Sequence, residues 1–249
     1  MELNRSVREL DSYLKNFSNK FKKRLQNSHQ INVLDAGCGN GMTMLGLVKL
    51  FPNKISITGY NQSRKHGSKE SMYERGIRKN IISKNERGIL NKQINFKYFD
   101  INKRRNMPFK DNQFDFIYSL GSVYLYNDKI HFLEECNRIL KPSGIARIHL
   151  LELKTKSIYF AREYLKRPES LDMYWELQGR KKTSILKYLG KFKNVTIGFG
   201  KKENGNTILY LELKKSPNFV MGLQPKKFIK NEQGVKSVYK LKVLRRHQH

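Results

Sequence analysis

The segment Val33–Thr43, which reads VLDAGCGNGMT, constrains the fold more than any other part of this sequence. An apolar run, Ile31–Ala36, leads into its glycine cluster, and a helical pattern over Met42–Phe51 follows it and stops at Pro52. Glycine has no Cβ atom, so the backbone can turn sharply here and approach a ligand without a steric clash. Free N–H groups at the start of the helix favour an anionic group. The segment therefore predicts a buried strand, a tight turn suited to a ligand, and a helix.

Short apolar runs alternate with helical patterns along most of the remaining chain. Strands are predicted at Ile55–Tyr60, Ile94–Phe99, Phe114–Ser119 and Ile145–Leu153, and helices within the polar stretch 62–88, at Lys129–Leu140 and at Thr183–Phe192. This alternation implies parallel βαβ units. The runs Val195–Phe199 and Thr207–Leu213, joined by the turn residues Lys201–Asn206, predict an antiparallel hairpin. We therefore predict an α/β fold with a doubly wound, mostly parallel sheet and an antiparallel hairpin at one edge.

Two segments flank the predicted domain, which spans residues 31–214. Residues 1–30 contain an amphipathic helical pattern over Leu3–Leu25, whose apolar residues recur at the helical period. We expect this helix to pack on the domain, and docking on a membrane or on RNA is the alternative. Residues 215–249 form a basic C-terminal extension in which Val235–Leu244 is a candidate strand.

The motifs that follow each predicted strand resemble those of class I S-adenosylmethionine-dependent methyltransferases. The glycine loop resembles the first motif of that family, and the resemblance covers roughly residues 31–152. Three further matches follow in order: Phe99-Asp100-Ile101 with the later Met107-Pro108-Phe109, Asn112–Asp115, and the turn Arg138–Gly144. Matches in the right order and spacing are far more specific than a lone glycine triplet. The resemblance implies a Rossmann-like sheet of the seven-stranded methyltransferase type, with S-adenosylmethionine as cofactor.

The resemblance also implies a set of cofactor-binding residues. The glycine loop wraps the methionine end in that family, an acidic residue after the second strand binds the ribose hydroxyls, and Asp100 takes the place of the aspartate that accepts from the adenine amino group. This sequence departs from the pattern at the ribose position, where GYNQS supplies Asn61, a neutral amide that both donates and accepts. The implied contacts are Asp35, Gly37, Cys38, Gly39, Gly41, Asn61, Gln62, Asp100, Ile101 and Ser119.

No catalytic residue is assigned from the sequence. The cofactor supplies an activated methyl group, so the protein mainly aligns the acceptor, and a general base is needed only for an acceptor that carries a proton of high pKa. Candidates follow the fourth strand, namely Tyr124, Tyr126 and Asp128, with packing at the pocket mouth as the alternative for the tyrosines. His131 and His149 are expected to be structural.

Several acceptor chemistries are disfavoured by residues that the sequence lacks. The segment SLGSVYLY after the fourth strand does not contain the N/D/S-P-P-aromatic string of the family's adenine amino-methyltransferases. Methylation of cytosine C5 needs a nucleophilic cysteine, and Cys38 and Cys136 lie in the glycine loop and in a predicted helix. The Lys-Asp-Lys-Glu set of ribose methyltransferases is not recognisable.

Charge points to the class of partner. Lysine and arginine number 50 against 21 acids, which gives a formal net charge of +29. Such a surface attracts polyanions, so an RNA or ribonucleoprotein acceptor is favoured. Two alternatives stay open, namely a small-molecule or lipid methyltransferase, and a non-catalytic scaffold that binds RNA or the ribosome. Candidate basic clusters are Lys22–Arg24, Lys103–Arg105, Arg180–Lys182, Lys226–Lys227 and Arg245–Arg246.

The remaining expectations concern compartment and metals. Two cysteines make no disulfide framework and have no metal-ligand spacing, so we expect a reducing compartment and no metal site. No run approaches the length of a membrane span, and no signal peptide is recognisable. We expect a cytoplasmic protein. A mitochondrial location is the alternative because the N-terminus is basic and amphipathic, although Glu2, Glu9 and Asp11 fall early.

Overall fold

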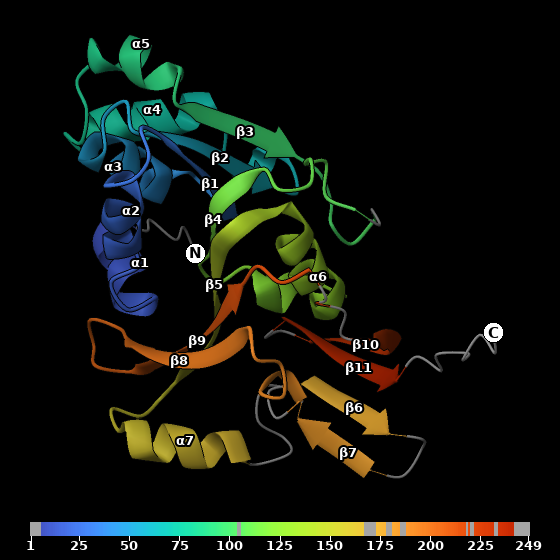
Figure 1. The fold of residues 1–249 in the computed structure, drawn as a ribbon. Coiled ribbons are helices and arrows are strands. Elements are labelled where there is room, and N and C mark those ends of the chain that lie inside the picture. The colour runs from blue at the N-terminus through green and yellow to red at the C-terminus, as the bar shows by residue number, and fades with distance from the viewer. Residues whose placement is uncertain are drawn as a thin grey trace.

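A seven-stranded mixed sheet in the order β3-β2-β1-β4-β5-β9-β8 forms the centre of the computed structural model (Figure 1). The structure describes residues 6–103, 106–166, 173–177, 181–184, 188–217, 219, 222–231 and 234–241. The strands of this sheet are β1 (Ile31–Ala36), β2 (Ile55–Asn61), β3 (Ile94–Tyr98), β4 (Phe114–Ser119), β5 (Leu140–Leu153), β8 (Val195–Lys201) and β9 (Thr207–Lys214).

The direction of each strand confirms the predicted sheet. β1 pairs parallel with β2 and β4, β2 with β3, and β4 with β5. β9 pairs antiparallel with both β5 and β8, so the predicted hairpin closes one edge of the sheet. The fold is therefore a doubly wound α/β sheet of the seven-stranded type.

Helices cover both faces of this sheet (Figure 1). They are α1 (Val7–Tyr13), α2 (Ser18–Leu25), α3 (Met42–Leu50), α4 (Lys69–Arg78), α5 (Glu86–Asn91), α6 (Lys129–Ile139) and α7 (Ile158–Lys166), with the short 3-10 helices η1 (Arg64–His66) and η2 (Val123–Leu125). Side chains of α1 to α5 form one apolar cluster with one face of the sheet, and side chains of α6 form a second cluster with the other face. No helix in the described part of the chain is long and apolar enough to span a membrane.

Alternating side chains of each strand explain these two clusters. Val33 and Phe116 belong to the cluster of the N-terminal helices, whereas their neighbours Leu34 and Ile117 belong to the α6 cluster. Successive residues of a strand point to opposite faces. The continuous apolar runs of the sequence are therefore those of strands that are buried on both faces.

The N-terminal segment forms two helices, so the prediction of one helix over Leu3–Leu25 is wrong. Lys15 and Asn16 adopt positive φ angles of 51° and 56°, which end α1 and turn the chain. Asp11 then accepts hydrogen bonds from the backbone N–H (2.7 Å) and the hydroxyl (2.5 Å) of Ser18 at the start of α2. The buried guanidinium of Arg147 on β5 donates to the carbonyls of Leu14 and Lys15. These side-chain hydrogen bonds stabilise a turn where the apolar pattern alone would continue one helix. Both helices pack on the domain, as expected.

A second sheet, in the order β10-β11-β6-β7, lies beside the first and was not expected from the sequence (Figure 1). Its strands are β6 (Met173–Leu177), β7 (Lys181–Ser184), β10 (Leu223–Asn231) and β11 (Gly234–Leu241). The predicted helix Thr183–Phe192 is therefore wrong at its start, because Thr183 pairs with Trp175 across β6 and β7; residues 185–187 lie outside the described residues. The candidate strand Val235–Leu244 is confirmed over 235–241, and its last residues also lie outside them.

The hydroxyl of Tyr239 on β11 joins this second sheet to helix α6, which packs on the seven-stranded sheet. It accepts hydrogen bonds from the backbone N–H of Lys129 (2.8 Å) and of Ile130 (3.4 Å), the first two residues of α6. The first N–H groups of a helix have no partner within the helix, and Tyr239 is fully buried here. Asp128 completes the cap by accepting from the N–H of His131. The C-terminal hairpin therefore stabilises the helix that follows η2.

Replacing Tyr239 with phenylalanine tests this docking. We expect the free energy of unfolding to fall by about 1–3 kcal/mol, because buried N–H groups of α6 lose their acceptor. Chemical denaturation of the wild type and the variant measures the difference. Tyr159→Phe is the matched control, since it removes the same hydroxyl group from a residue that is 67% exposed. Equal losses in both variants would contradict the proposed docking role.

Candidate functional site

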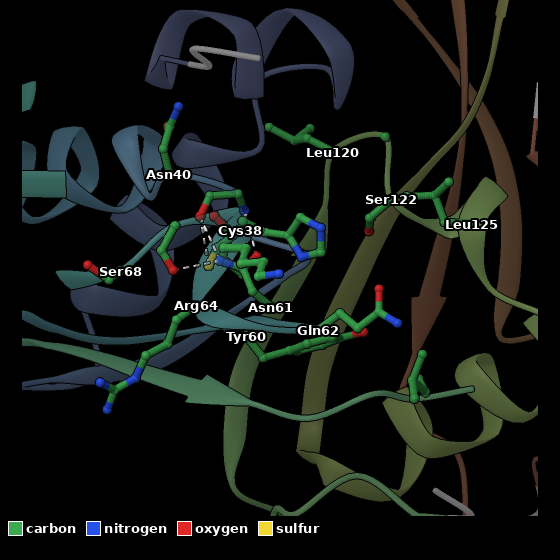
Figure 2. A pocket seen from close by; sticks show the side chains of 18 of the residues that line it. Cys38, Asn40, Tyr60, Asn61, Gln62, Arg64, Ser68, Leu120, Ser122 and Leu125 are labelled. Atoms are coloured by element: carbon green, nitrogen blue, oxygen red, sulfur yellow. Dashed lines mark hydrogen bonds between the residues drawn. The ribbon is translucent and has the colours of Figure 1, made fainter. Parts of the chain in front are cut away.

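A cavity of about 720 Å³ opens at the carboxyl ends of β1, β2 and β4, where ligands bind in open α/β sheets. Its volume falls in the range of about 300–1,000 Å³ that small-molecule sites occupy. Each wall comes from the segment that follows a strand: the glycine loop after β1, the η1 segment after β2, the loop after β3, and η2 after β4. Figure 2 shows these walls facing one another, with Asn40 and Ser68 on one side and Leu120, Ser122 and Leu125 on the other.

The three glycines of the loop have positive φ angles but different surroundings. The angles are 78° at Gly37, 54° at Gly39 and 74° at Gly41. A Cβ atom at Gly37 would clash with the side chain of Ser122, and one at Gly41 would lie 2.8 Å from the sulfur of Met72. At Gly39 a Cβ atom would meet nothing within 4 Å, and Gly39 lines the cavity. Gly37 and Gly41 therefore permit close packing, whereas Gly39 leaves open space at the cavity wall.

Residues at the end of β2 hold the glycine loop in place by hydrogen bonds. The carbonyl of Tyr60 accepts hydrogen bonds from the N–H groups of both Gly37 and Cys38, each 3.1 Å long. Asn61 is buried, and its Oδ1 accepts from the N–H of Gly39 at 2.9 Å while its Nδ2 donates to the carbonyl of Gly39 at 2.7 Å. The structure thus places the Asn61 side chain against the glycine loop (Figure 2).

Gln62 and Asp100, two of the predicted cofactor contacts, line the cavity and form a hydrogen bond with each other. Gln62 Nε2 donates to one oxygen of Asp100 at 2.9 Å, and the backbone N–H of Asn102 donates to the other at 3.0 Å. Ile101 lines the cavity beside them. A carboxylate held in this way keeps further lone pairs for a donor such as an exocyclic amino group.

A chain of buried hydroxyls forms the floor of the cavity. The hydroxyl oxygens of Tyr60 and Tyr126 lie 2.7 Å apart, Tyr126 and Ser122 lie 3.0 Å apart, and Ser122 and Ser119 lie 2.7 Å apart. Ser122 also donates to the carbonyl of Ala36 at the end of β1. Ser119 is fully buried and is not among the cavity-lining residues, so it acts on the site through Ser122.

Burial keeps this floor uncharged. It raises the pKa of the Tyr60 hydroxyl well above its ordinary value, and the neighbouring Tyr126 raises it further. Burial likewise raises the pKa of Tyr126. Burial, followed by the charge of Asp35, raises the pKa of the Cys38 thiol. The tyrosines and the thiol are therefore protonated at neutral pH.

The catalytic candidates from the sequence have three different placements. Tyr126 belongs to the hydroxyl chain, and Tyr124 lines the cavity with 41% of its surface exposed. Asp128 caps α6 and is not among the cavity-lining residues. His131 lies on α6, and His149 makes an edge-to-face contact with Tyr13, with ring centroids 5.4 Å apart. Neither histidine is among the cavity-lining residues.

A basic rim was missed by the sequence analysis. The exposed side chains of Arg64, Lys65 and His66 line the cavity from η1, and the guanidinium carbon of Arg64 lies 5.6 Å from the centre of the Tyr98 ring. The signal was present, because these residues directly follow the GYNQS string. Lysine and arginine are so frequent elsewhere in the chain that this short basic run did not stand out.

The cavity suits S-adenosylmethionine. The open space at Gly39 accommodates a ligand backbone, and the buried carboxylate of Asp35 on the cavity wall complements an ammonium group. Phe99 and Ile101 offer apolar contact next to the carboxylate of Asp100, a combination that suits a purine with an amino group. These residues are the ones that would hold the methionine and adenine ends.

Comparison with known proteins agrees with this assignment. Residues 34–148 match a family model described as a methyltransferase domain, which is a little under half of the chain. This range contains the glycine loop, Asn61, Asp100 and the segment Arg138–Gly144, which forms the end of α6 and the start of β5. The resemblance to S-adenosylmethionine-dependent methyltransferases, and with it the expected cofactor, is therefore confirmed at the level of the family.

Curated relatives share this part of the chain. A 27-O-demethylrifamycin SV methyltransferase of Amycolatopsis mediterranei is 25% identical over 112 residues, which are 45% of this chain and 35% of that protein. A tRNA U34 carboxymethyltransferase of Campylobacter curvus is 28% identical over 113 residues, which are 45% of this chain and 32% of that protein. The chain thus aligns with about a third of the length of these relatives.

Among solved structures, a SAM dependent methyltransferase from Aquifex aeolicus is similar to this chain. It has 18% sequence identity and a TM-score of 0.47, and the match covers 83% of this chain and 96% of that one.

Replacing Gly39 with aspartate tests the loop as a cofactor cradle. We expect binding of S-adenosylmethionine to be lost, because a carboxylate would fill the open space at the cavity wall. Calorimetric titration measures the affinity of wild type and variant. Gly222→Asp is the matched control, since Gly222 has a similar φ of 61°, equally open surroundings and no place in the cavity lining. Unchanged affinity in Gly39→Asp would refute the assignment of the loop.

Proposed function

Residues 34–148 match the methyltransferase-domain family, and from this premise we propose that the chain uses S-adenosylmethionine to transfer a methyl group to an RNA or ribonucleoprotein acceptor. The observation that carries the proposal is a cofactor-sized cavity with an uncharged floor and a basic rim. The activity itself is part of the proposal, since the aligned segment spans about a third of the curated relatives.

In the proposed chemistry, the main task of the protein is to align the acceptor with the methyl group of the cofactor. The cofactor, when bound, supplies a methyl group activated by its sulfonium. Asp35 and the glycine loop orient the methionine end, and Asp100 with Gln62 orients the adenine. Holding an acceptor in line with the methyl group can lower the barrier by several kcal/mol. The protonated hydroxyls of Tyr60 and Tyr126 add oxygen dipoles to the floor without a competing nucleophile.

Charge at the rim favours a phosphate-bearing acceptor. The exposed cations Arg64 and Lys65 stand at the cavity mouth, in a chain with a net charge of +29. Phosphate contacts dominate the affinity of proteins for nucleic acids. The exposed ring of Tyr124 at the opposite wall offers a surface on which an unpaired base can stack. A tRNA-modifying enzyme is also among the relatives.

A small-molecule acceptor is the second candidate. The apolar side chains of Leu120 and Leu125 line the cavity near Tyr124, and Leu125 is 51% exposed. An exposed apolar lining suits an apolar acceptor, and a rifamycin methyltransferase is among the relatives. The third alternative, a scaffold that binds RNA without transferring a methyl group, is separated from both by a direct activity assay.

The acceptor class is tested with S-adenosylmethionine that carries a labelled methyl group. We expect label to enter total RNA in the presence of the purified chain, and RNA binding to weaken steeply as salt rises. Label in small molecules alone would favour the second candidate. Salt-sensitive RNA binding without transfer would favour the scaffold.

The rim is tested with the double variant Arg64→Ala/Lys65→Ala. We expect weaker RNA binding and a salt slope reduced by about one for each lost phosphate contact. The control is Arg78→Ala/Lys79→Ala, which removes the same charge from exposed positions at the end of α4 that do not line the cavity. Equal effects of the two double variants would mean that general charge, and not the rim, attracts the RNA.

A further inference from the structure

We propose that Asn61 is a clamp that joins the glycine loop to the η1 segment, and that the site requires a neutral amide there instead of a ribose-binding carboxylate. The inference about the free protein rests on geometry alone. Its consequence for cofactor affinity rests on the proposed function.

Backbone partners fix the orientation of the amide. Oδ1 accepts from the N–H of Gly39 at 2.9 Å, and Nδ2 donates to the carbonyl of Gly39 at 2.7 Å and to that of Gly67 at 3.4 Å. A flipped amide would set N–H against N–H and oxygen against two carbonyls. Asn61 is only 3% exposed, and both of its N–H donors are already used. Few of its hydrogen-bonding positions are left for a ribose.

The clamp joins two segments that touch closely. Gly67, which follows η1, has a φ of 138°, and a Cβ atom there would clash with the carbonyl oxygen of Gly39. Backbone thus lies directly on backbone at this point. The Nδ2 of Asn61 donates to the carbonyl on each side of this contact, that of Gly39 and that of Gly67. The amide therefore sets the position of Gly39 together with that of the rim residues Arg64, Lys65 and His66.

An aspartate cannot replace this amide. One carboxylate oxygen could still accept from the Gly39 N–H, but the other would face the carbonyl oxygens of Gly39 and Gly67 with no proton to donate. Buried acceptors left without a donor are costly, and a charge makes the contact repulsive. Asn61→Asp should therefore loosen the loop, although it restores the acid that is usual in the family at this position.

Hydrogen–deuterium exchange of the cofactor-free protein tests the clamp directly. We expect the Gly39 amide to exchange slowly in the wild type, and about tenfold faster or more in both Asn61→Asp and Asn61→Ser. Asn80→Asp, an amide-to-acid change at an exposed position, should leave this rate unchanged. Equal exchange at Gly39 in wild type and both Asn61 variants would overturn the clamp, whether or not the protein binds a cofactor.

Titration with S-adenosylmethionine tests the consequence for the site. We expect Asn61→Asp and Asn61→Ser each to weaken binding by about tenfold or more. If Asn61 instead bound the ribose of the cofactor, the carboxylate introduced by Asn61→Asp would tighten binding. Tighter binding by Asn61→Asp would overturn the requirement for an amide. A wild type that binds no cofactor would instead contradict the proposed function and leave the exchange test to decide the clamp.

Discussion

The hydrogen bonds from the end of β2 to the glycine loop are the interaction on which the candidate site depends. The Tyr60 carbonyl and the Asn61 amide together bind the N–H groups of Gly37, Cys38 and Gly39. A loop with positive φ angles at alternate residues has no regular secondary structure to hold it, so its hydrogen-bond partners decide its path. The same loop also shapes the floor, since Gly37 allows Ser122 to approach and Ser122 bonds to Tyr126.

Electrostatics divide the cavity into two parts. The floor is a chain of hydroxyls that burial keeps protonated, so it is polar but uncharged. The rim carries exposed cations on η1, and an exposed aromatic ring lies on the wall that η2 forms. An uncharged floor suits alignment of a reactive cofactor, whereas a charged rim suits capture of an anionic acceptor. Under the proposed function, the rim is the part of this positively charged chain that meets the acceptor.

The parts of the fold that could be predicted are those with strong local signals. Strands β1 and β4 have the predicted bounds because their apolar runs end at glycine or polar residues. The two N-terminal helices could not be predicted, since the break at Lys15 and Asn16 depends on Arg147, which reaches the turn from β5, and on how the Asp11 side chain of α1 bonds to Ser18. The second sheet was missed because its centre is the pairing of β6 with β11, which lie far apart in the sequence, and because lysines interrupt the apolar pattern of β7, β10 and β11. Within the site, the residue types at Asn61 and Asp100 were readable from motifs, but what the Asn61 side chain bonds to was not.

The proposed function requires that the cavity bind S-adenosylmethionine. Calorimetric titration of the folded wild-type chain, freed of co-purified nucleic acid, tests this most directly. We expect a single site with a dissociation constant in the micromolar range. A folded, nucleic-acid-free sample that releases no heat with the cofactor would contradict it, and the cavity would then be the remnant of a methyltransferase fold that serves another purpose.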